Sequence, residues 1–153
     1  MFGEKEKTVI YIGSDHAGFK IKGDLLAFLR EQDYEVTDLG CFSEEPCDYP
    51  DIAREVGEKV LERAGSYGIL LCGTGAGVSM AANRLKGIRA VLGANEDLAE
   101  MGRRHNDANV LTMGARTTDL AAMKKIALKF LTTPFAGEER HIRRTQKMDE
   151  FED

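Results

Sequence analysis

The chain has 153 residues, which is close to the usual size of one domain and long enough to bury a hydrophobic core. Its 42% hydrophobic and 31% charged residues are typical of a globular protein that folds in water. The net charge of −5 argues against a dedicated nucleic-acid-binding protein, although it does not argue against a local basic site.

The three cysteines do not predict a disulfide framework, because their number is odd and the chain is of moderate length. Cys41 and Cys47 are too far apart for a C-x-x-C pair, and no cysteines and histidines have the spacing of zinc ligands. No apolar run is long enough to span a membrane, and the first residues lack the apolar segment of a signal peptide. We therefore expect a protein of the reducing cytoplasm, and no function is assigned to Cys41 or Cys47.

Short apolar runs alternate with segments of helical periodicity along the whole chain. They predict strands over residues 8–14, 34–40, 68–71, 88–92 and 109–113. They predict helices over residues 19–32, 51–65, 78–85, 96–107, 118–131 and 137–153. This alternation is typical of a three-layer α/β/α, Rossmann-like fold with a five-stranded parallel sheet, so we expect a single domain over residues 1–153.

The two ends of the chain differ from the rest. Residues 1–7 are expected to be disordered. The last helix, residues 137–153, is highly charged and has few apolar residues for a core face. We expect this helix to pack on a partner subunit rather than on its own sheet.

Residues 67–79 form the stretch around which the chain is organised. They read as a strand, a glycine-rich loop and the start of a helix. Such a loop presents backbone N–H groups at a helix N-terminus, where an anion or a developing oxyanion can bind. Cys72 stands where the strand ends. The G-x-G-x-G spacing of residues 73–77 is not the dinucleotide-binding pattern, and the loop has no G-K-[ST] sequence of a P-loop.

Polar side chains follow most of the predicted strands. Because the carboxyl ends of parallel strands lie at one edge of a sheet, these side chains should converge. They are Asp15, His16, Cys72, Thr74, Asn95 and Arg116. His105 and Asn106 end a helix and belong to the opposite edge, so a second subunit would have to bring them to the same site, which favours a homodimer.

Each candidate also has an ordinary structural interpretation. A buried cysteine such as Cys72 is often only a small hydrophobic residue, and Asp15 could simply cap the first helix. His16 could be a surface residue, and His105 with Asn106 could be no more than a polar helix end. The arginines of the last helix could form only a solvated face with local ion pairs.

Together these groups favour chemistry on a small phosphorylated substrate. Arginines bind phosphate through two hydrogen bonds, and a thiol, two histidines and an oxyanion loop suit proton transfer beside a carbonyl. An aldose–ketose isomerisation needs neither a metal nor another cofactor, and none is expected. Two other classes stay open: a non-catalytic nucleotide- or anion-binding module, and a nicotinamide-dependent reductase, which would need Asp38 for the ribose although the glycine loop follows the wrong strand.

Four segments resemble the ribose-5-phosphate isomerase B family, which also includes isomerases of galactose 6-phosphate and allose 6-phosphate. They are residues 13–20 (GSDHAGFK), 48–50 (DYP), 68–77 (GILLCGTGAG) and 104–111 (RHNDANVL). The resemblance extends from about residue 8 to residue 144. It implies an isomerase of the pentose phosphate pathway that interconverts ribose 5-phosphate and ribulose 5-phosphate, or acts on a six-carbon sugar phosphate, in a dimer or tetramer without nucleic-acid or membrane partners.

The resemblance also implies roles for individual residues. Cys72 would be the base that moves a proton between C1 and C2, assisted by Thr74, and His105 of the partner subunit would open the sugar ring. The remaining substrate-binding positions implied are Asp15, His16, Gly73, Gly75, Ala76, Gly77, Asn106, Arg116, Arg140 and Arg144.

Overall fold

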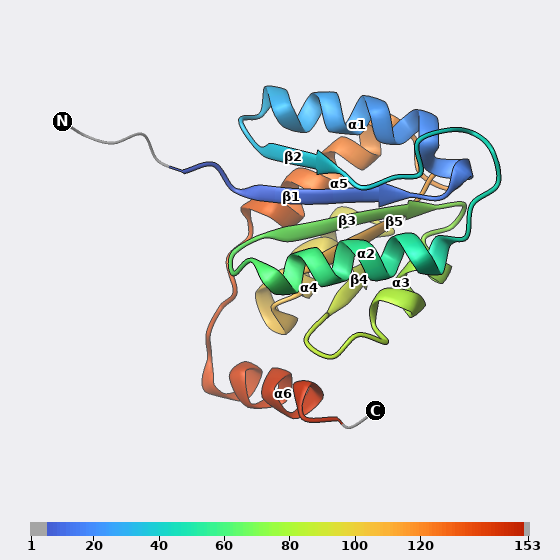
Figure 1. Ribbon diagram of the computed structural model, residues 1–153. Helices are drawn as coiled ribbons and strands as arrows, with labels where there is room; N and C mark the ends of the chain where they lie inside the picture. Colours follow the sequence, from blue (N-terminus) through green and yellow to red (C-terminus); the bar gives the residue numbers. More distant parts are fainter. Residues whose placement is uncertain (1–5, 152–153) are drawn as a thin grey trace.

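A computed structural model describes residues 6–151 of the chain, and its centre is one twisted parallel sheet (Figure 1). The strands are β1 (Val9–Ser14), β2 (Glu35–Asp38), β3 (Tyr67–Cys72), β4 (Ala90–Leu92) and β5 (Val110–Gly114). They lie in the order β2-β1-β3-β5-β4, and every neighbouring pair is parallel. The predicted five-stranded parallel sheet is therefore confirmed.

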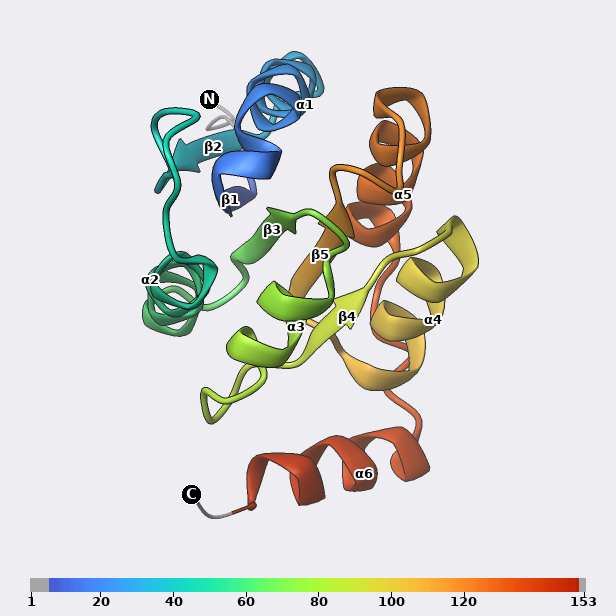
Figure 2. The same ribbon diagram turned by 90° about the vertical axis from the view of Figure 1, so that its right-hand side faces the viewer.

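Helices cover both faces of this sheet, as Figure 2 shows in a view along the strands. The helices are α1 (Phe19–Glu31), α2 (Tyr49–Glu62), α3 (Ala76–Ala82), α4 (Glu96–Asn106) and α5 (Leu120–Thr132), followed by α6 (Glu139–Asp149). Helices α1, α4 and α5 share one hydrophobic core with the sheet, and α2 and α3 share the other. This is the predicted three-layer α/β/α arrangement.

Strand β3 shows how the two cores are divided. Its side chains alternate between faces, so Ile69 and Leu71 belong to the core under α1 and α5. Leu70 and Cys72 belong to the core under α2 and α3. The alternation therefore places the thiol of Cys72 on the same side of the sheet as the helix that follows the glycine loop.

Most predicted boundaries agree with the observed elements to within a few residues. The turn between β1 and α1 is a short 3₁₀ helix, η1 (His16–Gly18). It forms because the Asp15 carboxylate accepts hydrogen bonds from the backbone N–H groups of Ala17 at 2.9 Å and Gly18 at 3.2 Å. Asn95 caps α4 in the same way, accepting from the N–H of Leu98 at 2.9 Å.

Helix α6 stands apart from the three layers and contacts its own chain at the end of α4 (Figures 1 and 2). Arg89 holds it through two hydrogen bonds to the Asp149 carboxylate at 2.9 and 3.0 Å. Its packing on a partner subunit stays a prediction. The prediction for residues 1–7 falls mostly outside the described residues; within them, Lys7 forms an exposed ion pair with Asp33 at 3.0 Å.

The cysteines differ from expectation. Cys41 and Cys47 form a disulfide, and Cys72 is free and buried. The expectation that no disulfide forms is therefore wrong for this pair. The disulfide can form because the loop between β2 and α2 folds back on itself. This brings two cysteines that are six residues apart in the sequence to a Cα–Cα distance of 6.7 Å.

Across residues 6–151, none of the helices combines the length and the apolar character needed to cross a membrane.

Candidate active site

The carboxyl ends of β1, β3 and β5 meet at one edge of the sheet, as their parallel order requires. The N–H of Asp15 donates to the carbonyl of Leu71 at 3.1 Å, and Cys72 pairs with Gly114 in the β3–β5 register. The N–H of Arg116 donates to the carbonyl of Gly73 at 2.9 Å. The structure thus brings together the predicted residues that follow these three strands.

Cys72 lies at the centre of this edge. Its side chain is buried, with 5% of the residue exposed, and its sulfur accepts a hydrogen bond from the N–H of Gly75 at 3.2 Å. The hydrogen bond holds the sulfur at the mouth of the glycine loop. This contact sets Cys72 apart from an ordinary buried cysteine that only fills space.

Gly75 can make this contact because it has a left-handed backbone, with φ of +84°. A Cβ at this position would lie 2.9 Å from the carbonyl carbon of Met113, so the loop passes too close to β5 for any side chain. Glycine at position 75 therefore allows the loop conformation in which its own N–H points towards the thiol.

The rest of the loop leads directly into α3. The hydroxyl oxygen of Thr74 accepts from the N–H of Ala76 at 3.3 Å, which leaves its O–H proton free to donate elsewhere. Gly77 lies beneath the ring of Tyr49, and a Cβ there would come within 2.8 Å of that ring. Tyr49 belongs to the DYP segment of residues 48–50, and no sequence pattern predicts this contact.

Arg116 is exposed and lies over the loop. A Cβ on Gly73 would be 3.1 Å from its guanidinium nitrogen Nη1. The cationic side chain thus extends across the glycine loop, a few residues after β5 ends. Such a position suits an arginine that binds the phosphate of a small substrate.

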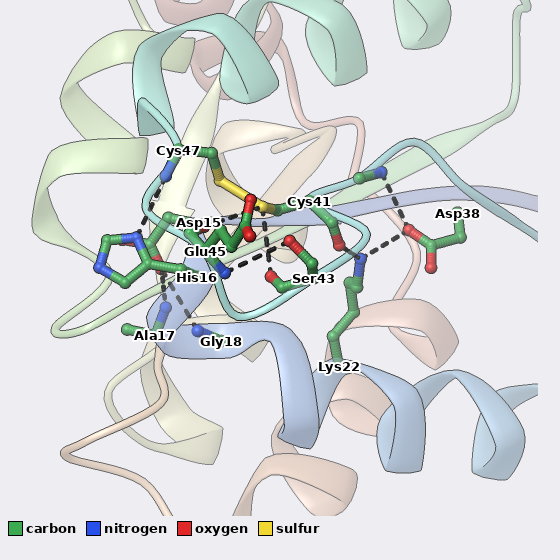
Figure 3. The surroundings of a disulfide bond; sticks show 11 residues. Asp15, His16, Ala17, Gly18, Lys22, Asp38, Cys41, Ser43, Glu45 and Cys47 are labelled. Carbon is green, nitrogen blue, oxygen red and sulfur yellow. Dashed lines mark hydrogen bonds and ion pairs between the residues drawn. A yellow bond between two sulfur atoms is a disulfide. The ribbon is translucent and has the colours of Figure 1, made fainter.

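Asp15 and His16 complete the described part of this edge (Figure 3). The carboxylate of Asp15 caps the η1 turn, so Asp15 does have a structural capping function. His16 is half-buried, and its Nδ1 accepts the backbone N–H of Cys47 at 3.4 Å. An accepting Nδ1 leaves Nε2 as the donor nitrogen of the neutral ring.

His105 and Asn106 lie at the opposite edge of the same sheet. They end α4, and the chain enters β5 at Val110, four residues after Asn106. The carbonyl of Asn106 accepts from Arg89, which lies just before β4 begins. The topological expectation is confirmed: one chain does not bring His105 to its own Cys72.

Two further predicted residues, Arg140 and Arg144, lie on α6 near this second edge. They are one helical turn apart and both are exposed. Arg140 forms an ion pair with Glu138. One chain therefore carries the predicted site in two halves, one around Cys72 and one around His105.

Comparison with known proteins identifies the family. The sequence model described as Ribose/Galactose Isomerase matches residues 10–148. The chain belongs to this isomerase family. The resemblance to ribose-5-phosphate isomerase B is confirmed by a protein of that name from Escherichia coli, which is 41% identical over 94% of this chain and 95% of its own length.

Solved structures agree with this assignment. The isomerase is similar to a ribose 5-phosphate isomerase from Thermotoga maritima, with a TM-score of 0.92 and 44% identity, over 95% of this chain and 100% of the other. It is also similar to Ribose-5-Phosphate Isomerase B from Clostridium thermocellum, with a TM-score of 0.90 and 42% identity, over 94% and 96% of the two chains. Among residues 6–151 of this isomerase, no three or more His, Cys, Asp and Glu side chains gather as metal ligands would.

The sequence did not point to His141 of the isomerase. Its ring stacks on that of His105, with centroids 4.6 Å apart and the ring planes inclined by 19°. His141 is 6% exposed, and within the described residues its Nε2 has no hydrogen-bond partner. His141 and Thr145 are the two buried residues of α6 and are four positions apart, so they lie on the same face of the helix. This spacing is the one sequence feature that points, weakly, to a buried face of α6.

Burial lowers the pKa of His141 below its ordinary value of 6.5. The electrostatic interactions with Arg140, His105 and Arg144 act in the same direction, and Glu138 opposes them. The unfolded chain takes up a proton at this position near pH 6.5, whereas the folded chain resists it. As the pH falls through this region, the unfolded state is therefore favoured.

We expect the melting temperature of the wild type to fall more steeply between pH 7 and pH 5 than that of a His141→Gln variant. Thermal unfolding of both proteins at several pH values measures the difference. Parallel curves for the two proteins would contradict this description of His141.

Proposed function

We propose that this isomerase interconverts ribose 5-phosphate and ribulose 5-phosphate through an enediolate, with Cys72 as the base and His105 as the acid that opens the ring. The observation that carries the proposal is the buried thiol of Cys72 with the Gly75 N–H on its sulfur, at the mouth of the glycine loop. The relatives named ribose-5-phosphate isomerase B support the choice of substrate. Such an activity belongs to the pentose phosphate pathway, and we place it in the cytoplasm.

Ring opening comes first in this mechanism. Ribose 5-phosphate is mostly a closed furanose. To expose the C1 aldehyde, the bond between C1 and the ring oxygen breaks, the ring oxygen gains a proton and the C1 hydroxyl loses one. His105 is half-buried and ends a helix, next to the exposed amide of Asn106. An imidazole can deliver this proton near neutral pH, and the Asn106 amide can hold a sugar hydroxyl beside it.

Proton transfer follows at the other half of the site. The Cys72 thiolate removes the proton from C2, and the negative charge moves to the oxygen on C1. The backbone N–H groups of residues 73–77 are proposed to stabilise this enediolate, and the free hydroxyl proton of Thr74 to bond one of the reacting oxygens. Cys72 then returns the proton to C1 while the hydroxyl proton moves from the oxygen on C2 to the oxygen on C1, which forms the ketose.

The phosphate end needs cations and hydrogen-bond donors. We assign it to Arg116 and His16 of one subunit and to Arg140 and Arg144 of its partner. Arg116 already lies across Gly73, and the free Nε2 of His16 is available as a donor. Asp15 would contact the sugar hydroxyls while its carboxylate continues to cap the η1 turn.

The two halves of the site support a homo-oligomer in which each active site is shared. A groove of about 980 Å³ separates α6 from β4 and the segment before it. Asn106 and the exposed side chains of Leu92, Met148 and Phe151 line this groove. An apolar surface next to Asn106 is what a partner subunit would cover when it docks.

A shared site predicts complementation between two inactive variants. In a mixed dimer of Cys72→Ala and His105→Ala chains, one site carries both changes and the other carries neither. We expect dimers purified through a different tag on each chain to recover about half of the wild-type activity, far more than either parent retains. Mixed dimers as inactive as their parents would show that Cys72 and His105 act within one chain.

The substrate is tested by steady-state assays of the purified protein on ribose 5-phosphate, allose 6-phosphate and galactose 6-phosphate. We expect the highest kcat/KM on ribose 5-phosphate. A higher kcat/KM on either six-carbon substrate would replace the proposed substrate, and turnover of none of them by a folded protein would refute the proposed function.

A further inference from the structure

The proposed reaction does not use the cysteine pair of the loop between β2 and α2. Cys41 is buried, and Cys47 is partly exposed, six residues further on. Figure 3 shows their disulfide beside the η1 turn, which carries Asp15 and His16. The free cysteine, Cys72, is not part of this pair.

The Cys41 end of the loop is firmly anchored. The N–H of Cys41 donates to the carbonyl of Ser14 at 2.7 Å, and its own carbonyl accepts from Lys22 Nζ at 2.6 Å. Lys22 is only 1% exposed, and its ammonium also pairs with Asp38 at 2.8 Å. A buried cation with two oxygen partners holds this point of the loop against the body of the protein.

The Cys47 end has much weaker support. Residues 42–46 are all exposed. Apart from the disulfide, the one hydrogen bond found for Cys47 within the described residues is the 3.4 Å contact from its N–H to His16 Nδ1. Asp48, the N-cap of α2, follows Cys47 directly. The covalent bond to the anchored Cys41 therefore adds to the start of α2 in holding the Cys47 amide against the imidazole.

From this geometry we propose that Cys41 and Cys47 form a thiol–disulfide exchange site for small disulfides of the glutathione class, and that closing the bond fixes His16 in the sugar-phosphate site. The exchange itself is independent of the isomerase reaction. Its effect on catalysis rests on the proposed function of His16.

The chemistry takes place in two exchange steps. The more accessible Cys47 thiolate attacks one sulfur of the small disulfide; a mixed disulfide forms, and one small thiolate leaves. The Cys41 thiolate then attacks the Cys47 sulfur, forms the internal disulfide and releases the second small thiolate. The two protein thiols lose two electrons and two protons, and the small disulfide becomes two small thiols.

Closing the bond acts on His16 through a backbone amide. While the Cys47 N–H occupies Nδ1, the ring is held in one orientation, and Nε2 carries the proton that a phosphate or hydroxyl can accept. Opening the bond releases residues 42–47 from Cys41. The His16 side chain then becomes ordered only when substrate binds, and the entropy lost in this ordering weakens binding. The chemical step is changed less.

Mass spectrometry tests the exchange site directly. The full-length protein is equilibrated in glutathione buffers from fully reduced to fully oxidised, and free thiols are then alkylated in denaturant. We expect an internal Cys41–Cys47 disulfide that forms in a single equilibrium, with Cys72 alkylated throughout. Mixed glutathione adducts on separate cysteines, without the internal bond at any ratio, would overturn the proposal.

NMR tests the link to His16 without relying on activity. The chain has three histidines, so one substitution each assigns the imidazole signals of His16, His105 and His141. We expect the His16 signals to shift between the two redox forms, while those of the two histidines at the far edge stay in place. A disulfide that closes without moving the His16 signals would overturn the link.

Kinetics then measures the consequence for the isomerase. We expect KM of the oxidised form to be roughly threefold to tenfold below that of the reduced form, with kcat changed by less than about twofold. Cys41→Ser and Cys47→Ser should have the KM of the reduced form in both buffers. If no sugar phosphate is turned over, the proposed function fails, whereas the mass and NMR results still decide the exchange site.

Discussion

A Cys72→Ala variant is expected to lose isomerisation by about 10³-fold or more in kcat, while it still binds ribose 5-phosphate. The Cys72 sulfur is buried and accepts the Gly75 amide of the glycine loop, whereas the buried Asp15 carboxylate at this edge is held by the amides of the η1 turn. Alanine at position 72 leaves no group there that can take up the C2 proton. Steady-state kinetics gives kcat, and calorimetric titration with ribose 5-phosphate gives the affinity of the inactive variant.

Matched controls for this result are Cys41→Ser and Cys47→Ser. Each removes one sulfur of the Cys41–Cys47 disulfide, which the proposed reaction does not use, and we expect kcat to stay within about twofold of the wild type. Near-normal turnover by Cys72→Ala would refute its assignment as the base. If Cys72→Ala lost both turnover and the binding of ribose 5-phosphate, the result would show instead that the substitution had disrupted the site.

The hydrogen bond from Gly75 fixes the Cys72 sulfur at the mouth of the glycine loop. In the proposed reaction the amides of the same loop would stabilise the enediolate as its charge develops, which makes the C2 proton easier to remove. The reaction therefore depends on the loop as well as on the thiol.

A His105→Ala variant is expected to lose about 10²-fold in kcat/KM on ribose 5-phosphate and much less in hydrogen exchange on ribulose 5-phosphate. Ribose 5-phosphate must be opened before Cys72 can act, whereas ribulose 5-phosphate is already an open chain. Coupled assays measure the first rate, and the exchange of C1 hydrogens in deuterated water measures the second.

The comparison of the two substrates separates ring opening from other functions of His105. Gln146→Ala, which removes an exposed side chain from α6, is a suitable control and should leave both rates unchanged. Equal losses on the closed and the open substrate would contradict the ring-opening role. They would indicate that His105 binds the substrate or supports the subunit interface instead.

The Cys72 half of the site could be predicted from the sequence because the fold determines it. Once strands and helices alternate, the carboxyl ends of parallel strands must lie at one edge. Asp15, Cys72 and Arg116 follow β1, β3 and β5, which are adjacent in the sheet, and they do converge. The same reasoning placed His105 at the other edge.

Other features depended on contacts that have no sequence pattern. The Cys41–Cys47 bond forms because an irregular loop turns back on itself, and no periodicity describes such a loop. His141 reaches His105 through the path of the segment before α6, which helical periodicity within α6 does not specify. Likewise, the position of β4 outside β5 is a property of the crossover connections rather than of either strand's residues.

The most direct test of the whole account is to follow ribose 5-phosphate by proton NMR in deuterated water with the purified wild-type protein. We predict that ribulose 5-phosphate forms with deuterium at C1, because a base passes the proton between carbons and exchanges it with the solvent. Neither ketose formation nor exchange of any sugar C–H by the folded protein would contradict the account.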